Sequence, residues 1–205
     1  MVPGVILAAG RSTRMGRAKP LLPCGPGGAS FVRSLACALC AGGVPSVLVV
    51  GRPDDHALRE EVAALPVPAR FVENPDADAG QLSSVLAGLD AADVPGTRGV
   101  LVTPVDAPLV TAGTVAALLA AFASSGAPIV RAVYRGKHGH PVVFSRDVFD
   151  SLRRADPAAG AKAVLRAHAS AIANVEVDDA GVVADVDTPE DYRALFGRGP
   201  GAGQE

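Results

Sequence analysis

The chain has 205 residues, of which 49% are hydrophobic, so it is long enough and apolar enough for one domain with a substantial core. Its formal charge of −2 argues against non-specific binding to nucleic acid and against a polybasic membrane anchor. It contains no apolar run of transmembrane length, and no basic segment of a signal peptide opens it, so we expect a cytoplasmic protein.

The first half of the chain alternates apolar strands with helices. Strands are predicted at 5–9, 46–51, 69–73 and 99–103, and helices at 31–41, 54–65 and about 81–92. Ser30 is the expected N-cap of the first helix, which Gly42 and Gly43 end. This order predicts an α/β fold whose parallel strands are joined by right-handed crossovers.

The pattern changes near residue 126, which suggests a lobe inserted on or beside the sheet. Thr111 is the expected cap of a helix that runs to about residue 124. Beyond it we predict strands at 128–134 and 142–144 around a turn at 136–141, helices at 146–154 and 160–168, a strand at 171–177, an extended segment at 182–186 and a closing helix at 189–196. We expect a single domain over 1–196 and a disordered, glycine-rich tail over 197–205.

A cationic loop follows the first strand. It carries Arg11, Arg14, Arg17 and Lys19 without an acidic residue among them. Its glycines let backbone N–H groups approach an anion, and ligands of open parallel sheets bind beyond the carboxyl ends of the strands. We therefore interpret the loop as a polyphosphate site; the alternative is a solvated basic loop.

Acidic residues follow two later segments. Asp106 lies between two prolines directly after a buried strand. Asp185 and Asp187 alternate on the segment predicted to be extended, so they should point to opposite faces, and either could reach Asp106. Mg²⁺ prefers one or two carboxylates together with phosphate oxygens and water, so we predict a Mg²⁺ site here. Helix capping and favourable helix-dipole contacts are the alternative role for these acids.

Two cysteines, Cys37 and Cys40, have the spacing of a redox or metal-binding pair. They lie in an apolar helical stretch, and the sequence has no second Cys/His pair at zinc spacing. We interpret them as small buried hydrophobic residues.

The opening loop matches neither a Walker P-loop nor a G-x-G-x-x-G fingerprint. Its pattern, L-A-A-G-x-S-x-R-M-G-x-x-K-x-L-L-P, resembles the molybdopterin cytidylyltransferases among the MobA-like NTP transferases. The resemblance continues in order through G-Q-x-S-S at 80–84, P-V-D-A-P at 104–108, G-H-P at 139–141, G-A-K at 160–162 and D-V-D-T-P-E-D at 185–191. It implies a three-layer, Rossmann-like nucleotide-diphospho-sugar transferase fold with a mixed, mostly parallel sheet.

The resemblance also implies an activity and a set of site residues. The activity is Mg²⁺-dependent transfer of CMP from CTP to the phosphate of molybdopterin, with release of pyrophosphate. Arg14, Lys19 and Asp106 would be catalytic, and Asp106 and Asp187 would bind the metal. The implied nucleotide-binding residues are Leu7, Ala8, Ala9, Gly10, Arg14, Lys19, Gln81, Ser83 and Ser84, and the implied acceptor-binding residues are Lys137, His140 and Lys162.

Three questions stay open at this point: the base of the nucleotide, the identity of the acceptor, and whether the protein is catalytic. Guanylyl-transferring relatives usually carry Gly where this chain has Ala9, and the extra methyl favours CTP over GTP. Lys162 replaces a family Arg and lacks its bidentate fork, so a sugar phosphate, methylerythritol phosphate or phospholactate is an alternative acceptor. A further alternative is a non-catalytic chaperone that binds the cofactor; a molybdoenzyme or a chaperone could also receive the product.

Overall fold

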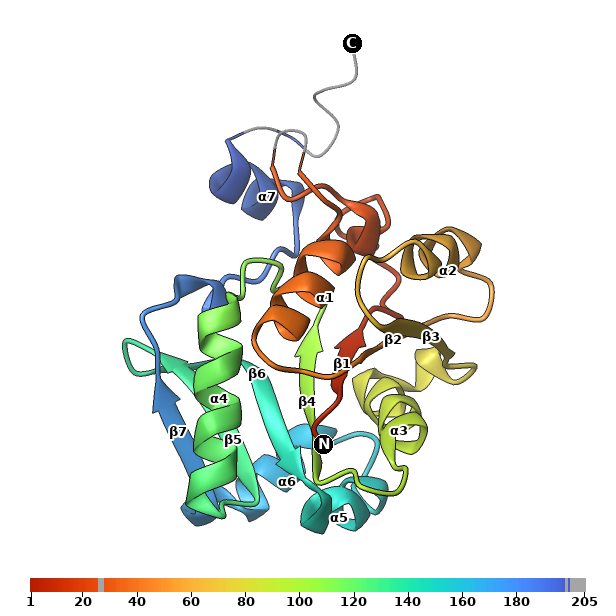
Figure 1. Ribbon diagram of the computed structural model, residues 1–205. Helices are drawn as coiled ribbons and strands as arrows, with labels where there is room; N and C mark the ends of the chain where they lie inside the picture. Colours follow the sequence, from red (N-terminus) through yellow and green to blue (C-terminus); the bar gives the residue numbers. More distant parts are fainter. Residues whose placement is uncertain (26–27, 198, 200–205) are drawn as a thin grey trace.

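The computed structural model describes residues 1–25, 28–197 and 199 (Figure 1). Most of the predicted disordered tail, residues 198 and 200–205, lies outside the described residues. Among the described residues, no helix has the length and apolar character to cross a membrane.

The sheet has seven strands in the order β3-β2-β1-β4-β6-β5-β7. Strand β6 runs antiparallel to its neighbours β4 and β5, and all other neighbouring pairs are parallel. This confirms a mixed, mostly parallel sheet. The strands are β1 (Gly4–Leu7), β2 (Val47–Gly51), β3 (Ala69–Glu73), β4 (Gly99–Pro104), β5 (Ile129–Tyr134), β6 (Lys137–Ser145) and β7 (Ile172–Glu176).

Helices cover both faces of this sheet. In Figure 1, α1 and α4 cover the near face, where their apolar side chains share one core cluster with those of α2. The apolar residues of α3, α5 and α6 form a second cluster on the opposite face, which gives three layers. The helices are α1 (Phe31–Ala41), α2 (His56–Ala63), α3 (Gln81–Ala92), α4 (Ala112–Ser125), α5 (Phe149–Arg153), α6 (Ala161–Ala167) and α7 (Pro189–Phe196).

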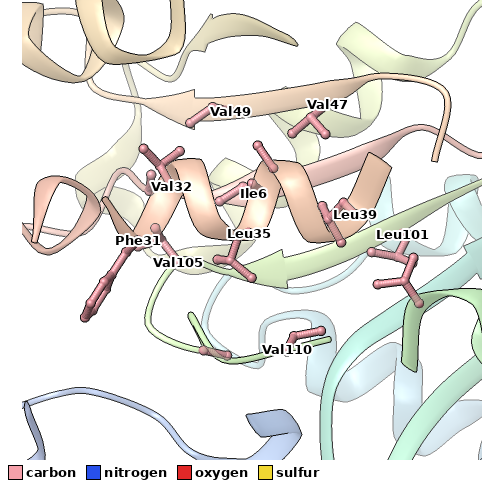
Figure 2. Packing of buried hydrophobic residues seen from close by; sticks show 14 of the residues in the cluster. Ile6, Phe31, Val32, Leu35, Leu39, Val47, Val49, Leu101, Val105 and Val110 are labelled. Atoms are coloured by element: carbon pink, nitrogen blue, oxygen red, sulfur yellow. The ribbon is translucent and has the colours of Figure 1, made fainter. Parts of the chain in front are cut away.

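Helix α1 shows how the sequence pattern builds this core. Its side chains Val32, Leu35 and Leu39 repeat at helical spacing, are fully buried, and pack against β1 and β2 (Figure 2). The Ser30 hydroxyl accepts a hydrogen bond from the backbone N–H of Arg33 at 3.2 Å, which confirms the predicted N-cap. Cys37 and Cys40 on the same helix are free and partly buried.

The second half differs from prediction in three places. Strands β5, β6 and β7 join the same sheet, so the suggested inserted lobe is wrong. The predicted turn at 136–141 is also wrong, because β6 begins at Lys137. The turn is only Arg135–Gly136, whose positive φ angles of 49° and 75° fit a two-residue hairpin. The predicted extended segment at 182–186 begins instead in a 3₁₀ turn, Ala180–Val183, where Asp179 accepts a hydrogen bond from the Gly181 N–H at 2.9 Å.

Candidate active site

Two clefts adjoin in this structure, the first at the carboxyl ends of β1 and β4 and the second along the neighbouring part of the sheet. The first has a volume of about 450 Å³ and is lined by the loop after β1, the segment before α3 and the end of β4. The second has a volume of about 630 Å³ and is lined by α3, the β6 strand and the segment at the start of α6. Leu7, Gly80 and Gln81 line both clefts, so the two spaces meet there.

Hydrogen bonds to one serine shape the cationic loop. The carbonyl of Ser12 accepts from the N–H groups of Met15 and Gly16, both at 3.1 Å, while its hydroxyl accepts from the Lys19 N–H at 3.2 Å. The Met15 side chain is 3% exposed and belongs to the core, so the loop is anchored as well as folded on itself. Ala9, Gly10, Arg14 and Lys19, all predicted to contact the nucleotide, line the first cleft.

Opposite charges from three distant segments meet in the first cleft. Lys19 Nζ lies 2.6 Å from Asp187 Oδ1 and 3.7 Å from Asp106 Oδ2, and Arg14 Nη2 lies 2.9 Å from Asp187 Oδ2. The hydrogen bond from Lys19 lowers the pKa of Asp187. Burial raises the pKa of Asp106, although the charge of Lys19 opposes that shift. The predicted cations and carboxylates therefore form one cluster.

Backbone geometry decides which acid of the 185–187 pair faces this cluster. The Val186 N–H donates to the Asp106 carbonyl at 2.8 Å, and the Val186 side chain is fully buried. Asp187 lines the first cleft, whereas Asp185 is exposed and does not. Asp187 is therefore the acid beside Asp106. The prediction from alternation was wrong, because residues two positions apart on an extended segment share a face.

The donor set around Lys19 fits a hard divalent cation. Carboxylate oxygens of Asp106 and Asp187 approach a single ammonium group, and such oxygens are the ligands that Mg²⁺ and Mn²⁺ prefer. Across the part of the chain that the structure describes, no group of three or more His, Cys, Asp or Glu side chains forms a complete metal site. Two carboxylates leave the remaining ligand positions for phosphate oxygens and water, as in typical Mg²⁺–nucleotide sites.

Three residues of this region were missed by sequence reasoning. Asp78 lies 2.6 Å from both Arg11 Nη2 and Arg52 Nη2, and Arg52 Nε donates to the Ala9 carbonyl at 3.0 Å. Arg52 directly follows β2, so the rule that ligands bind at strand ends could have identified it. Asn74 is 3% exposed and donates to the hydroxyls of Ser83 and Ser84, both at 2.9 Å.

Not every residue predicted to contact the nucleotide reaches a cleft. Ser84 lines the first cleft, whereas Ser83 bonds to the Gly80 carbonyl at 2.8 Å and does not line it. Ala8 is buried behind the cleft wall, and its N–H donates to the Val50 carbonyl at 2.8 Å.

Strand β6 contributes the side chains of one of its faces to the second cleft. His138, His140, Val142 and Phe144 line it at the two-residue period of a strand, whereas Lys137 does not line it. Lys137 was predicted beside the acceptor because its segment was interpreted as a turn; in a strand it belongs to the opposite face.

His140 and Lys162 do reach the second cleft. Burial lowers the pKa of His140 below its ordinary value of 6.5, so the ring is neutral at pH 7. Its Nδ1 is buried and has no hydrogen-bond partner among the described residues. Lys162 is exposed at the start of α6.

Comparison with known proteins agrees with this architecture. The chain is 33% identical to the purine catabolism protein PucB of Bacillus subtilis, over 92% of this chain and 93% of that protein. It is 35% identical to a 2-C-methyl-D-erythritol 4-phosphate cytidylyltransferase of Cereibacter sphaeroides, over 80% and 75% of the two chains. It is 28% identical to a probable molybdenum cofactor guanylyltransferase of Mycobacterium avium, over 94% and 93%.

Among solved structures, Rv0371c of Mycobacterium tuberculosis superposes with a TM-score of 0.80 at 27% identity, covering 96% of this chain and 98% of that one. A complex of Rv0371c with manganese matches with a TM-score of 0.73 at 28% identity, over the same shares of the two chains. The profile of the MobA-like NTP transferase domain matches residues 4–189. The chain therefore belongs to the family of MobA-like NTP transferases and is a nucleotidyltransferase.

Proposed function

We propose that this nucleotidyltransferase moves CMP from CTP to the phosphate of molybdopterin and releases pyrophosphate. The observation that carries the proposal is the meeting of the two clefts at Leu7, Gly80 and Gln81. A nucleotide in the first cleft and a phosphorylated acceptor in the second would bring their phosphates together at that junction, beside Asp106 and Lys19.

In this proposal the triphosphate replaces a carboxylate as the partner of two cations. Arg14 and Lys19 are paired with Asp187. Phosphate oxygens accept strong, charge-assisted hydrogen bonds from guanidinium and ammonium groups, so both side chains would turn to the bound nucleotide. Ala9, Gly10, Gln81 and Ser84 would contact the nucleotide from the cleft wall.

Asp106 and Asp187 would then hold the metal, which we propose is Mg²⁺. The chemistry that Mg²⁺ supplies in such a site is neutralisation of the charge on the reacting phosphates and on the departing pyrophosphate. Carboxylate oxygens also bind Mn²⁺, so the choice between these two ions is part of the test.

The reaction needs no general base from the chain. An oxygen of the acceptor phosphate attacks the α-phosphorus of the nucleotide, and the bond from that phosphorus to the bridging oxygen breaks. The bridging oxygen leaves with pyrophosphate and keeps the bonding electrons. His140, neutral at pH 7, would hydrogen-bond the acceptor without adding charge, and Lys162 would supply a positive charge at the cleft rim.

The test combines nucleotides and acceptors. CTP, GTP and ATP are each incubated with molybdopterin, methylerythritol phosphate or a sugar phosphate, with Mg²⁺ or Mn²⁺, and pyrophosphate release is measured. We expect release with CTP and molybdopterin. Release only with GTP would replace the cytidylyl activity by a guanylyl one, and release only with a non-pterin acceptor would overturn the molybdopterin proposal. Membership of a transferase family argues against a non-catalytic chaperone.

A further inference from the structure

The second cleft is lined by cationic and imidazole side chains without a carboxylate among its described lining residues. The first cleft, by contrast, includes three aspartates, Asp78, Asp106 and Asp187. The basic side chains of the second cleft are Arg131, His138, His140, Lys162 and Arg166, and most of its remaining surface is apolar. This surface favours a ligand that combines negative or hydrogen-bond-accepting groups with an apolar body.

Arg131 stands on strand β5 of the sheet, whereas Lys162 and Arg166 belong to helix α6. In the strand register, Val102 of β4 pairs with Val142 of β6, Val142 pairs with Arg131 of β5, and Arg131 pairs with Asn174 of β7. The first two positions are buried valines, so a guanidinium continues an apolar row across the cleft floor. Its guanidinium is the polar group of this row, so the row offers a ligand both apolar contact and hydrogen-bond donors.

The partner of Arg131 orients the guanidinium without neutralising it. Nε and Nη2 donate to the amide oxygen of Asn174 at 3.1 and 2.9 Å. Arg131 forms no ion pair with any residue that the structure describes, and partial burial lowers its pKa. Arginine nevertheless stays charged in proteins, so the group keeps its positive charge and still has Nη1 donors to offer.

We propose that Arg131, oriented by Asn174, is a specificity-determining residue that binds the planar part of the acceptor. Val142, beside Arg131, is two residues further along β6 than His140, which corresponds to roughly 7 Å along a strand. Arg131 therefore contacts the end of the acceptor that is remote from the attacking phosphate. A guanidinium fork fits two hydrogen-bond acceptors in one plane, as on the edge of a heteroaromatic ring that carries a carbonyl. This inference rests on the proposed function.

The test compares Arg131→Met with Arg131→Lys, using CTP with molybdopterin or with methylerythritol phosphate, which has no planar edge. For molybdopterin we expect R131M to raise the acceptor KM by about 10- to 100-fold, R131K to recover only part of that loss, and the CTP KM to stay unchanged. Any activity with methylerythritol phosphate should be insensitive to either change. Asn174→Asp, which gives Arg131 a carboxylate partner, should raise the molybdopterin KM without lowering the melting temperature.

Arg70→Met is the matched control. Arg70 is also a strand arginine that donates to a neutral oxygen, the Ala91 carbonyl at 2.6 Å, but it lies outside both clefts. Its replacement should leave both KM values unchanged. An acceptor KM for R131M within twofold of wild type would overturn the inference.

Failure of the proposed function would give a different result, namely no transfer to molybdopterin by the wild-type protein. Equilibrium dialysis of molybdopterin against wild type and R131M then decides the role of Arg131. Weaker binding to R131M supports the inference, and equal binding, or none to either protein, overturns it.

Discussion

Asp106 is the residue on which the proposed chemistry depends most. Its carboxylate is partly buried beside Lys19 and is joined through the backbone to the segment that carries Asp187. We expect Asp106→Ala to abolish pyrophosphate release while the melting temperature stays close to that of wild type, because the lost group lines the cleft and its burial disfavours the charged form. Activity assays and thermal unfolding of the same preparation check this.

The controls for this prediction also separate the two acids of the 185–187 pair. Asp185→Ala should keep most of the activity, since Asp185 is exposed outside the cleft, whereas Asp187→Ala should lose it. Undiminished turnover by the Asp106 variant would contradict the metal assignment, and equal losses at 185 and 187 would contradict the choice of Asp187.

Asn74 is expected to matter for both stability and nucleotide binding. Its buried amide donates to the hydroxyls of Ser83 and Ser84, so Asn74→Ala leaves two serines in the first turn of α3 without that partner. We expect the free energy of unfolding to fall by about 2 kcal/mol, the usual size for buried groups left unpaired, and the nucleotide KM to rise because Ser84 lines the cleft. Denaturant unfolding and steady-state kinetics measure the two effects. The exposed Asn174→Ala should change stability much less, and equal stability losses would contradict the prediction.

Some site residues belong to short sequence motifs and could be predicted. Others become site residues only through contacts between segments that are distant in sequence. Arg14, Lys19 and Asp106 belong to short motifs whose composition already indicates phosphate and metal chemistry. Asn74 and Asp78 stand in an ordinary turn-forming stretch, N-P-D-A-D-A-G. Their importance arises only when β3 and α3 bring them against Ser84 and Arg52, and no pattern of spacing encodes those contacts.

At the scale of elements, Asp179 joins the segment after β7 to the start of α4. One carboxylate oxygen accepts from Thr114 Oγ1 at 2.6 Å and from Thr111 Oγ1 at 2.8 Å, and the other accepts from the Gly181 N–H. Burial alone would raise the pKa of Asp179, but these hydrogen bonds outweigh it and lower the pKa below its ordinary 3.8. A carboxylate with a lowered pKa stabilises the fold above its unfolded-state pKa, and that contribution disappears as the pH falls through the folded-state pKa.

We therefore expect Asp179→Ala to cost about 2 kcal/mol of unfolding free energy at pH 7 and less below pH ~4. Urea unfolding at both pH values measures this difference. Asp178→Ala, which removes an exposed neighbouring carboxylate, should be close to neutral at both. A cost for the Asp179 variant that does not depend on pH would show that the charge is not what matters.

Strand β6 shows why one element was assigned wrongly. Glycine and proline in G-K-H-G-H-P are typical of turns, and proline is rarely found inside a central strand. The structure accommodates Pro141 where the pairing of β5 with β6 shifts register, between Arg131 and Val133, so no regular ladder hydrogen bond is lost there. The strand register was not visible in the local composition, and the assignment of Lys137 to the acceptor side followed from the wrong element.

At the scale of the whole molecule, the clefts divide between the two halves of the chain. The parallel half, up to β4, supplies most of the first cleft, and the part built around β6 supplies most of the second. Asp187 is the exception, since it returns from the C-terminal segment to the first cleft. The alternation of strands and helices predicted the parallel half well, because its buried strands are apolar runs. The antiparallel pairing of β6 with β4 was not predicted, because it depends on contacts between residues distant in sequence.

This division predicts that substrate affinities can be changed separately. Lys19→Met, in the first cleft, should raise the nucleotide KM by about 10-fold or more, because a charge-assisted contact to phosphate is lost, and should leave equilibrium binding of the acceptor intact. His140→Leu, in the second cleft, should weaken acceptor binding and leave nucleotide binding unchanged. Titration of each variant with each substrate alone measures four affinities. If both variants weakened both substrates equally, the clefts would act as one site, and the separate placement of nucleotide and acceptor would be wrong.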